Sequence, residues 1–140
     1  MTIIMDKNND NFYYIVAGDE MQKLMALKFP DRKTIPFRED FSKGEGVGFD
    51  FDAEMISKRA SFWNVSTEDY IDKLSPIINL DLTKKYVLCF GDDACCKANL
   101  AFMIENLKAK GYSQPIQVQI LNEYNLELQK KVFYKELNIC

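Results

Sequence analysis

Two continuous apolar runs are the clearest feature of the chain, and each of them ends at a glycine. The first covers residues 12–17 and precedes Gly18, and the second covers residues 86–90 and precedes Gly91. Aromatic and β-branched runs without alternating polar positions are typical of strands that are buried on both faces. The pattern therefore predicts two central strands of a sheet that carries helices on each side.

Apolar residues recur at helical spacing in four further segments, which we expect to be helices: residues 19–29, 53–63, 66–78 and 92–110. Ser66 and the acidic residues that follow it are typical of a helix N-terminus, whereas Pro30 and Gly111 are typical of a helix end.

Three shorter segments complete the expected sheet. Residues 34–37 suit an edge strand or a strand end, because Pro36 cannot donate a ladder hydrogen bond. Residues 116–121 alternate as a half-exposed strand does, and residues 126–137 fit either a helix or a strand. This order predicts a single Rossmann-like α/β domain over residues 12–140, with a mostly parallel sheet of about four or five strands flanked by helices. Residues 1–11 are expected to be a flexible lead-in.

The composition is that of a globular protein, and the scarce residues narrow the chemistry. The 140 residues contain no histidine, which excludes Ser-His and Cys-His nucleophile pairs. The four cysteines form no CxxC pair, so we expect free thiols in a reducing compartment. The net charge is −3 and the basic residues are scattered, so no nucleic-acid partner is expected. No apolar run is long enough for a signal peptide or a membrane span, which predicts a cytoplasmic protein without a membrane partner.

Two similar turns follow the two apolar runs and supply the first candidate site residues: Gly18, Asp19, Asp92 and Asp93. Ligands of open parallel sheets bind beyond the carboxyl ends of the strands, near helix N-termini. The carboxylates suit hydroxyl groups or a hard cation; Mg²⁺ is therefore possible, although no cofactor is predicted and no residue is assigned to a metal. The alternative is that Asp19, and Asp92 or Asp93, only cap the helices that they precede.

A loop of about fifteen residues, 38–52, supplies the second candidate set, since connections of this length are usually functional or disordered. Its first residues bring together a cation, a carboxylate, a hydroxyl and a glycine: Arg38, Asp40, Ser42 and Gly44. Arg38 suits a carboxylate or phosphate ligand, or else it pairs with Asp40 or Glu39 and fixes the loop. Arg59 could face the same site, whereas Trp63 is expected in the core.

These segments resemble a bacterial family known only as the domain of unknown function 1835. The resemblance rests on residues 15–19, on residues 35–44 followed by 59–63, and on residues 86–94, and its most specific element is Asp-Phe-Ser-x-Gly at residues 40–44. It covers most of the chain and implies a Rossmann-like domain without an established activity. Two positions depart from the family pattern: Glu45 stands where a proline is common, and Cys95-Cys96-Lys97 replace a polar cluster.

Two functions fit these observations. The first is binding of a small polar or anionic ligand at the carboxyl edge of the sheet; if the protein is an enzyme, carboxylate-assisted or Mg²⁺-assisted hydrolysis or group transfer is the expected class. The alternative is a non-catalytic interaction or self-association module that uses Phe49 and Phe51 as exposed anchors, with a homo-oligomer as its product.

Overall fold

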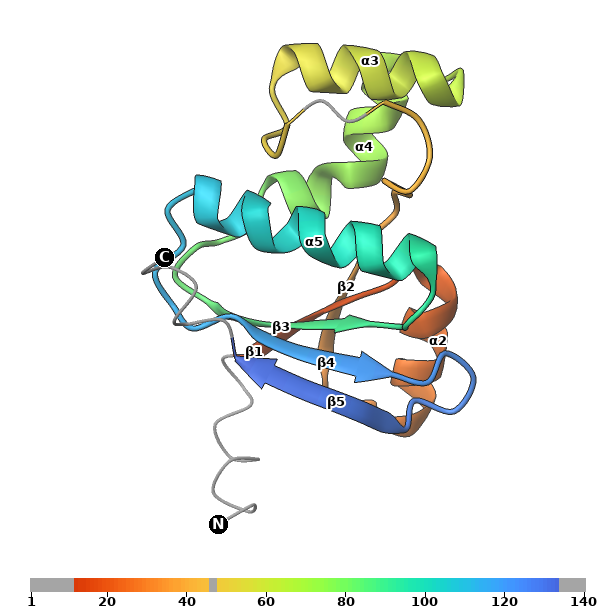
Figure 1. The fold of residues 1–140 in the computed structure, drawn as a ribbon, viewed down its shortest axis with the longest axis vertical. Helices are drawn as coiled ribbons and strands as arrows, with labels where there is room; N and C mark the ends of the chain where they lie inside the picture. The colour runs from red at the N-terminus through yellow and green to blue at the C-terminus, as the bar shows by residue number, and fades with distance from the viewer. Residues whose placement is uncertain (1–11, 46–47, 134–140) are drawn as a thin grey trace.

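The computed structural model describes residues 12–45 and 48–133 and shows an α/β fold built on a five-stranded sheet (Figure 1). Its elements in chain order are β1 (Phe12–Val16), α2 (Asp19–Lys28), β2 (Lys33–Pro36), α3 (Ala53–Trp63), α4 (Thr67–Ile78), β3 (Lys85–Phe90), α5 (Ala94–Ala109), β4 (Gln117–Leu121) and β5 (Leu128–Phe133).

The sheet has the strand order β2-β1-β3-β4-β5 and is parallel except at β5. From β1 the chain turns outward to β2, and from β3 it turns the opposite way to β4, so the direction of winding reverses between β1 and β3. Ligands of such sheets bind beyond the carboxyl ends of the strands near this reversal. The topology therefore places the turns after β1, β2 and β3 at one edge.

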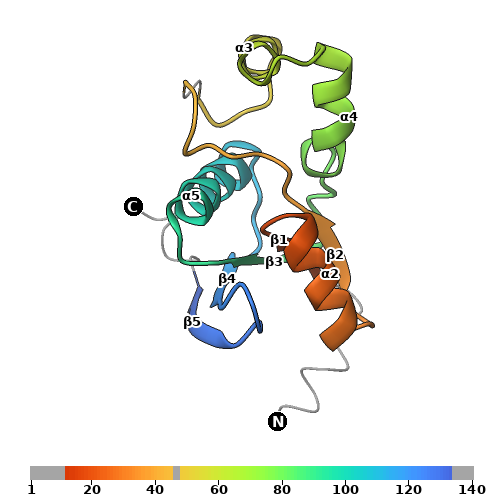
Figure 2. The same ribbon diagram turned by 90° about the vertical axis from the view of Figure 1, so that its right-hand side faces the viewer.

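Helices cover both faces of the sheet, which explains the unbroken apolar runs of β1 and β3. Met21 and Met25 of α2 pack against Val16 and Cys89 on one face. On the other face α4 and α5 pack against Ile15, Leu88 and Phe90, together with the aromatic residues of the loop that follows β2 (Figure 2). The expected Rossmann-like α/β architecture is thus confirmed.

Most of the expected elements are present, and β2 is an edge strand as the proline in it predicts. The segment left open, 126–137, forms a strand over Leu128–Phe133 that pairs antiparallel with β4. The expected lead-in at residues 1–11 lies outside the described residues. Within the described part of the chain, no helix is both long and apolar enough to cross a bilayer.

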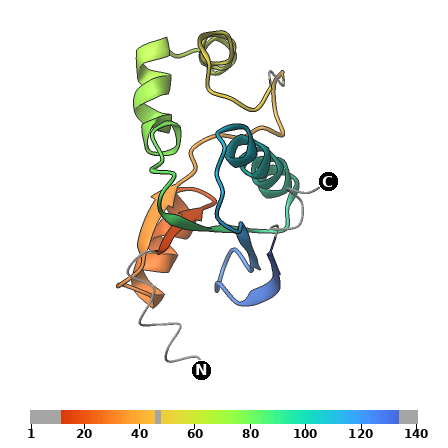
Figure 3. The same cartoon turned by 90° about the vertical axis from the view of Figure 1, so that its left-hand side faces the viewer.

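Helices α3 and α4 stand beyond the end of β2, joined to the sheet by the loop that precedes α3 (Figure 3). Both are capped by side chains: Asp52 accepts a hydrogen bond from the Met55 amide at 2.8 Å, and Ser66 accepts one from the Asp69 amide at 3.0 Å. These caps satisfy orphan amides and fix where each helix begins. The sequence therefore sets the start of both helices locally.

We expect Asp52→Ala to lower the free energy of unfolding by about 1 kcal/mol, because it removes the cap of α3. Asp52→Ser is the control, since serine keeps an oxygen that can accept the same amide. Urea denaturation followed by circular dichroism measures both. Equal stability of Asp52→Ala and the unchanged protein would contradict the capping role.

Candidate functional site

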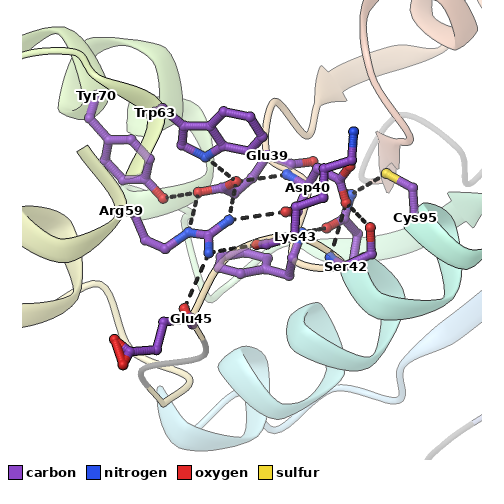
Figure 4. A network of polar contacts seen from close by, with 11 residues as sticks. Glu39, Asp40, Ser42, Lys43, Glu45, Arg59, Trp63, Tyr70 and Cys95 are labelled. Atoms are coloured by element: carbon purple, nitrogen blue, oxygen red, sulfur yellow. Dashed lines mark hydrogen bonds and ion pairs between the residues drawn. The ribbon is translucent and has the colours of Figure 1, made fainter. Parts of the chain in front are cut away.

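The carboxylate of Glu39 is fully buried and accepts five hydrogen bonds (Figure 4). Oε1 accepts from Arg59 Nη2 at 2.8 Å, from Trp63 Nε1 at 2.9 Å and from the Asp40 amide at 2.7 Å. Oε2 accepts from Arg59 Nε at 3.0 Å and from the Tyr70 hydroxyl at 2.5 Å. One side chain of the loop thereby joins α3, where Arg59 and Trp63 lie, to α4, where Tyr70 lies.

The five donors also decide the charge of this group. Burial alone would raise the pKa of Glu39, but the hydrogen bonds from Arg59, Tyr70 and the Asp40 amide, with the positive charge of Arg59, outweigh burial and lower the pKa below its ordinary value. The pKa of Tyr70 is raised by burial and by its hydrogen bond to Glu39. Glu39 is therefore ionised and Tyr70 is a neutral donor at neutral pH.

Arg59 is buried and uses its remaining donors on the loop backbone. Nη1 donates to the Lys43 and Glu45 carbonyls at 2.9 and 3.2 Å, and Nη2 donates to the Asp40 carbonyl at 3.0 Å. Its guanidinium carbon lies 4.7 Å from the centre of the Phe41 ring. The guanidinium therefore holds the loop in place and has no donor directed at the solvent.

Gly44 is required by the same packing. Its φ of +79° suits glycine, and a Cβ there would lie 2.7 Å from Arg59 Nη1 and 3.0 Å from the Phe62 ring. Any larger residue would push the guanidinium away from the loop.

On its other side the loop is attached to α5. Asn99 donates to the Glu39 carbonyl at 2.7 Å and accepts from the Phe41 amide at 2.8 Å. The ring of Phe41 stacks on Phe102 with centroids 4.1 Å apart. Residues 39–45 thus lie between α5 and the α3–α4 pair and are ordered by contacts to both.

A cavity of about 350 Å³ opens where this loop meets the end of β1 and the α3–α4 pair. Its volume lies in the usual range of small-molecule sites. The lining combines aromatic and apolar side chains with charged ones and comes from four segments: Gly18, Asp19, Phe37, Arg38, Glu39, Asp40, Trp63, Val65, Asp69, Tyr70 and Lys73.

Two cations of the cavity wall retain unused donors. Arg38 donates only Nε, to Asp19 Oδ1 at 3.0 Å, so its Nη1 and Nη2 amino groups have no partner among the described residues. Lys73 makes no ion pair with any residue that the structure describes. Both groups can donate to an anion in the cavity.

The N-terminus of α2 also opens onto this cavity. Its N-cap is Gly18, whose φ of +147° favours glycine, and no side chain of residues 12–45 or 48–133 caps the helix. The positive end of the helix dipole therefore adjoins the cavity through Gly18 and Asp19, an arrangement that favours a negative group.

The structure brings four of the nine candidate residues together in this cavity: Gly18, Asp19, Arg38 and Asp40. The other five lie outside its lining: Ser42, Gly44, Arg59, Asp92 and Asp93. Ser42 donates its hydroxyl to Asp40 at 2.5 Å and Asp93 caps α5 by accepting from the Cys96 amide at 2.7 Å. Asp92 forms an exposed ion pair with Lys97 at 3.7 Å.

Several sequence-based expectations need correction. Asp19 does not cap α2, because it is the first helical residue and pairs with Arg38. Arg38 pairs with neither Glu39 nor Asp40, since Glu39 turns inward and Asp40 accepts from Ser42.

The aromatic expectations also differ from the structure. Trp63 is 38% exposed at the cavity rather than in the core, because its indole N–H must reach Glu39. Phe51 is buried, so of the two expected surface anchors only Phe49 is exposed. Phe49 lies beside Phe102, with ring centroids 6.1 Å apart.

Among the described residues, three side chains offer potential metal-ligating atoms within 4.8 Å of one another: Asp93, Cys96 and Glu123. The hydrogen bond that Glu123 donates to the Asp93 carboxylate raises the pKa of Glu123, and burial raises the pKa of Cys96 to about 12. Asp93 is also occupied by its capping bond. A neutral thiol beside a hydrogen-bonded acid pair is a poor match for Mg²⁺, which takes an octahedral set of oxygen ligands.

The groups around the cavity are better suited to binding than to proton transfer. Glu39 has its lone pairs occupied and a lowered pKa, which disfavours a role as general base. Cys95 donates to Asp40, and burial followed by this bond raises the pKa of the thiol to about 11, so it is not an activated nucleophile.

We expect Glu39→Gln to lower the free energy of unfolding by about 3–5 kcal/mol, because it leaves Arg59 buried without a counter-charge. Glu54→Gln is the matched control: Glu54 also pairs with a cation on α3, Lys58, at 3.2 Å, but both side chains are exposed. The control should change stability by less than about 0.5 kcal/mol. Urea denaturation measures both, and equal effects of the two variants would contradict the account.

The lowered pKa of Glu39 predicts a pH dependence. A carboxyl whose pKa falls on folding stabilises the protein fully above its unfolded pKa, ordinarily 4.5, and loses this contribution as the pH falls through the lower folded pKa. The stability difference between the unchanged protein and Glu39→Gln should therefore be constant near neutral pH and shrink below about pH 4.5. Urea denaturation from pH 7 to pH 3 tests this; a difference that stays constant throughout would refute it.

Comparison with known proteins gives no relative for this arrangement. No family model matches the chain, and no match is found among curated proteins or among solved structures. The similarity to the domain of unknown function 1835 stays a prediction.

Proposed function

We propose that the chain binds a small anion-bearing ligand in the cavity between the end of β1 and the α3–α4 pair. The observation that carries this proposal is the pair of cations in the lining, since Arg38 and Lys73 both retain donors without a partner among the described residues. A carboxylate or phosphate would accept from the two terminal amino groups of Arg38, whose planar fork fits either group.

The position of the cavity supports the same proposal. It adjoins the uncapped N-terminus of α2 at the carboxyl ends of β1 and β2, where Gly18 lets a ligand approach the backbone closely. The apolar surface of Phe37, Trp63 and Val65 would exclude water around such a contact and strengthen it.

Binding is the proposed activity because the two most buried acid–base groups of the cavity, Glu39 and Tyr70, are already engaged with each other and with Arg59. A carboxylate-assisted or Mg²⁺-assisted reaction and membership of the domain of unknown function 1835 remain predictions from the sequence, as does a cytoplasmic location. The alternative of self-association now depends on Phe49 without Phe51; light scattering of Phe49→Ser would show whether this ring joins copies of the chain.

We expect Arg38→Gln to weaken binding of ribose 5-phosphate, used as an anionic probe, by about tenfold or more, which is the usual effect of losing hydrogen bonds to a charged group. Isothermal titration calorimetry measures the affinity, with ribose as the uncharged comparison.

Lys97→Gln is the matched control because it removes one positive charge near the N-terminus of α5, outside the cavity lining. It should leave the affinity nearly unchanged. Equal affinity of Arg38→Gln and the unchanged protein, or equal affinity for ribose and ribose 5-phosphate, would overturn the proposal.

A further inference from the structure

Trp63 gives the cavity a rigid aromatic wall. Its indole N–H is fixed by Glu39 Oε1 at 2.9 Å, the Arg59 guanidinium lies 5.8 Å from its ring centre, and Phe62 packs edge-on with centroids 4.7 Å apart. Trp63 as a whole residue is nevertheless 38% exposed, and it lines the cavity together with Val65, which is 43% exposed. The position of the ring is thus set by contacts inside the protein, and its uncovered surface is available to a ligand.

A flat apolar surface of this kind selects planar groups. Stacking of a nucleobase on an aromatic side chain contributes about 1–3 kcal/mol to the binding free energy, whichever base is present. Because Trp63 is held before binding, little conformational entropy is lost when a ring stacks on it. The cavity therefore offers both an aromatic wall and, at Arg38 and Lys73, cationic groups for an anion.

Charge in the cavity limits how negative the ligand can be. Three further carboxylates line it alongside the two cations: Asp19, Asp40 and Asp69. The carboxylate of Glu39 forms a buried ion pair with Arg59, which balances its charge. Arg38 already pairs with Asp19, so the two cations offer unused donors to one phosphate but no excess of positive charge, and a triphosphate would bring its extra negative charges close to three carboxylates. Asp69 makes no side-chain hydrogen bond to a described residue, and carboxylates of this kind accept readily from sugar hydroxyls.

We infer that the ligand of this cavity is a nucleoside monophosphate: its base stacks on Trp63, its phosphate binds Arg38 and Lys73, and its ribose hydroxyls donate to carboxylates of the same lining. This inference rests on the proposed anion-binding function. It specifies in addition that the ligand carries a nucleobase, a ribose and no more than one phosphate. Any nucleobase can stack on an indole ring, so both adenosine monophosphate and guanosine monophosphate are expected to bind.

The test uses the single tryptophan of the chain as a reporter. Adenosine monophosphate, ribose 5-phosphate, adenosine and adenosine triphosphate are titrated into the full chain, with tryptophan fluorescence and calorimetry recorded in parallel. Adenosine monophosphate should quench the fluorescence saturably and bind at least about fivefold more tightly than ribose 5-phosphate. Adenosine and adenosine triphosphate should both bind more weakly than the monophosphate.

Variants separate the ring from the phosphate. Trp63→Leu should reduce the affinity for adenosine monophosphate to that for ribose 5-phosphate, and leave the latter nearly unchanged. Since this substitution also removes a donor to Glu39, Val65→Asn serves as a second variant. It makes the same wall polar without removing a hydrogen bond to Glu39. It should weaken binding of adenosine monophosphate and leave binding of ribose 5-phosphate unchanged.

The outcomes distinguish the two proposals. If ribose 5-phosphate and adenosine monophosphate bind with equal affinity and both depend on Arg38, the anion site stands and the nucleotide inference fails. If adenosine, which has no phosphate, binds as tightly as adenosine monophosphate, the proposal of an anion site is overturned. Tighter binding of adenosine triphosphate would overturn the limit of one phosphate, and absence of binding by all four compounds would overturn both proposals.

Discussion

The buried carboxylate of Glu39 is the constraint on which the rest of this site depends. An ionised carboxylate without water is unfavourable unless opposite charge and hydrogen bonds replace the lost solvation, and here five donors from three segments do so. Because those donors include Arg59, Trp63 and Tyr70, the replacement works only when the α3–α4 pair stands against the loop. Most of the residues that make these contacts also form the cavity wall. The shape of the cavity therefore depends on how the protein compensates the charge of Glu39.

Much of the fold could be predicted because local signals and burial agree. The unbroken apolar runs identify β1 and β3. Ser66 marks a helix start because its hydroxyl caps the first turn, and Gly111 follows a helix end because glycine adopts the positive φ found there. The segment after residue 126 is ambiguous from the sequence because residues 132–134 favour a strand whereas residues 126–130 favour a helix. What decides it is non-local: β4 would otherwise be an unpaired edge, and Leu128–Phe133 pairs with it.

The candidate site was predicted only in part, because turns that share a sheet edge need not share a cavity. The strand-end rule identified Gly18 and Asp19, but it could not show that Asp93 would serve as a cap. Glu39 was missed although a signal existed: Ile35, Phe37 and Glu39 alternate, so Glu39 points to the same inner side as Phe37. Similarly, Met55 and Arg59 are four residues apart and share one helical face, so the apolar Met55 indicates that Arg59 turns inward.

A double-mutant cycle between Glu39 and Arg59 tests the central claim most directly, because it isolates their coupling from other effects of each substitution. Glu39→Gln, Arg59→Met and the double variant would be compared with the unchanged protein by urea denaturation, since urea does not screen charge. A directly coupled buried pair predicts that the double variant is more stable than the sum of the single effects by about 1–3 kcal/mol. Additivity within about 0.5 kcal/mol would show that the two residues act independently and would contradict the account.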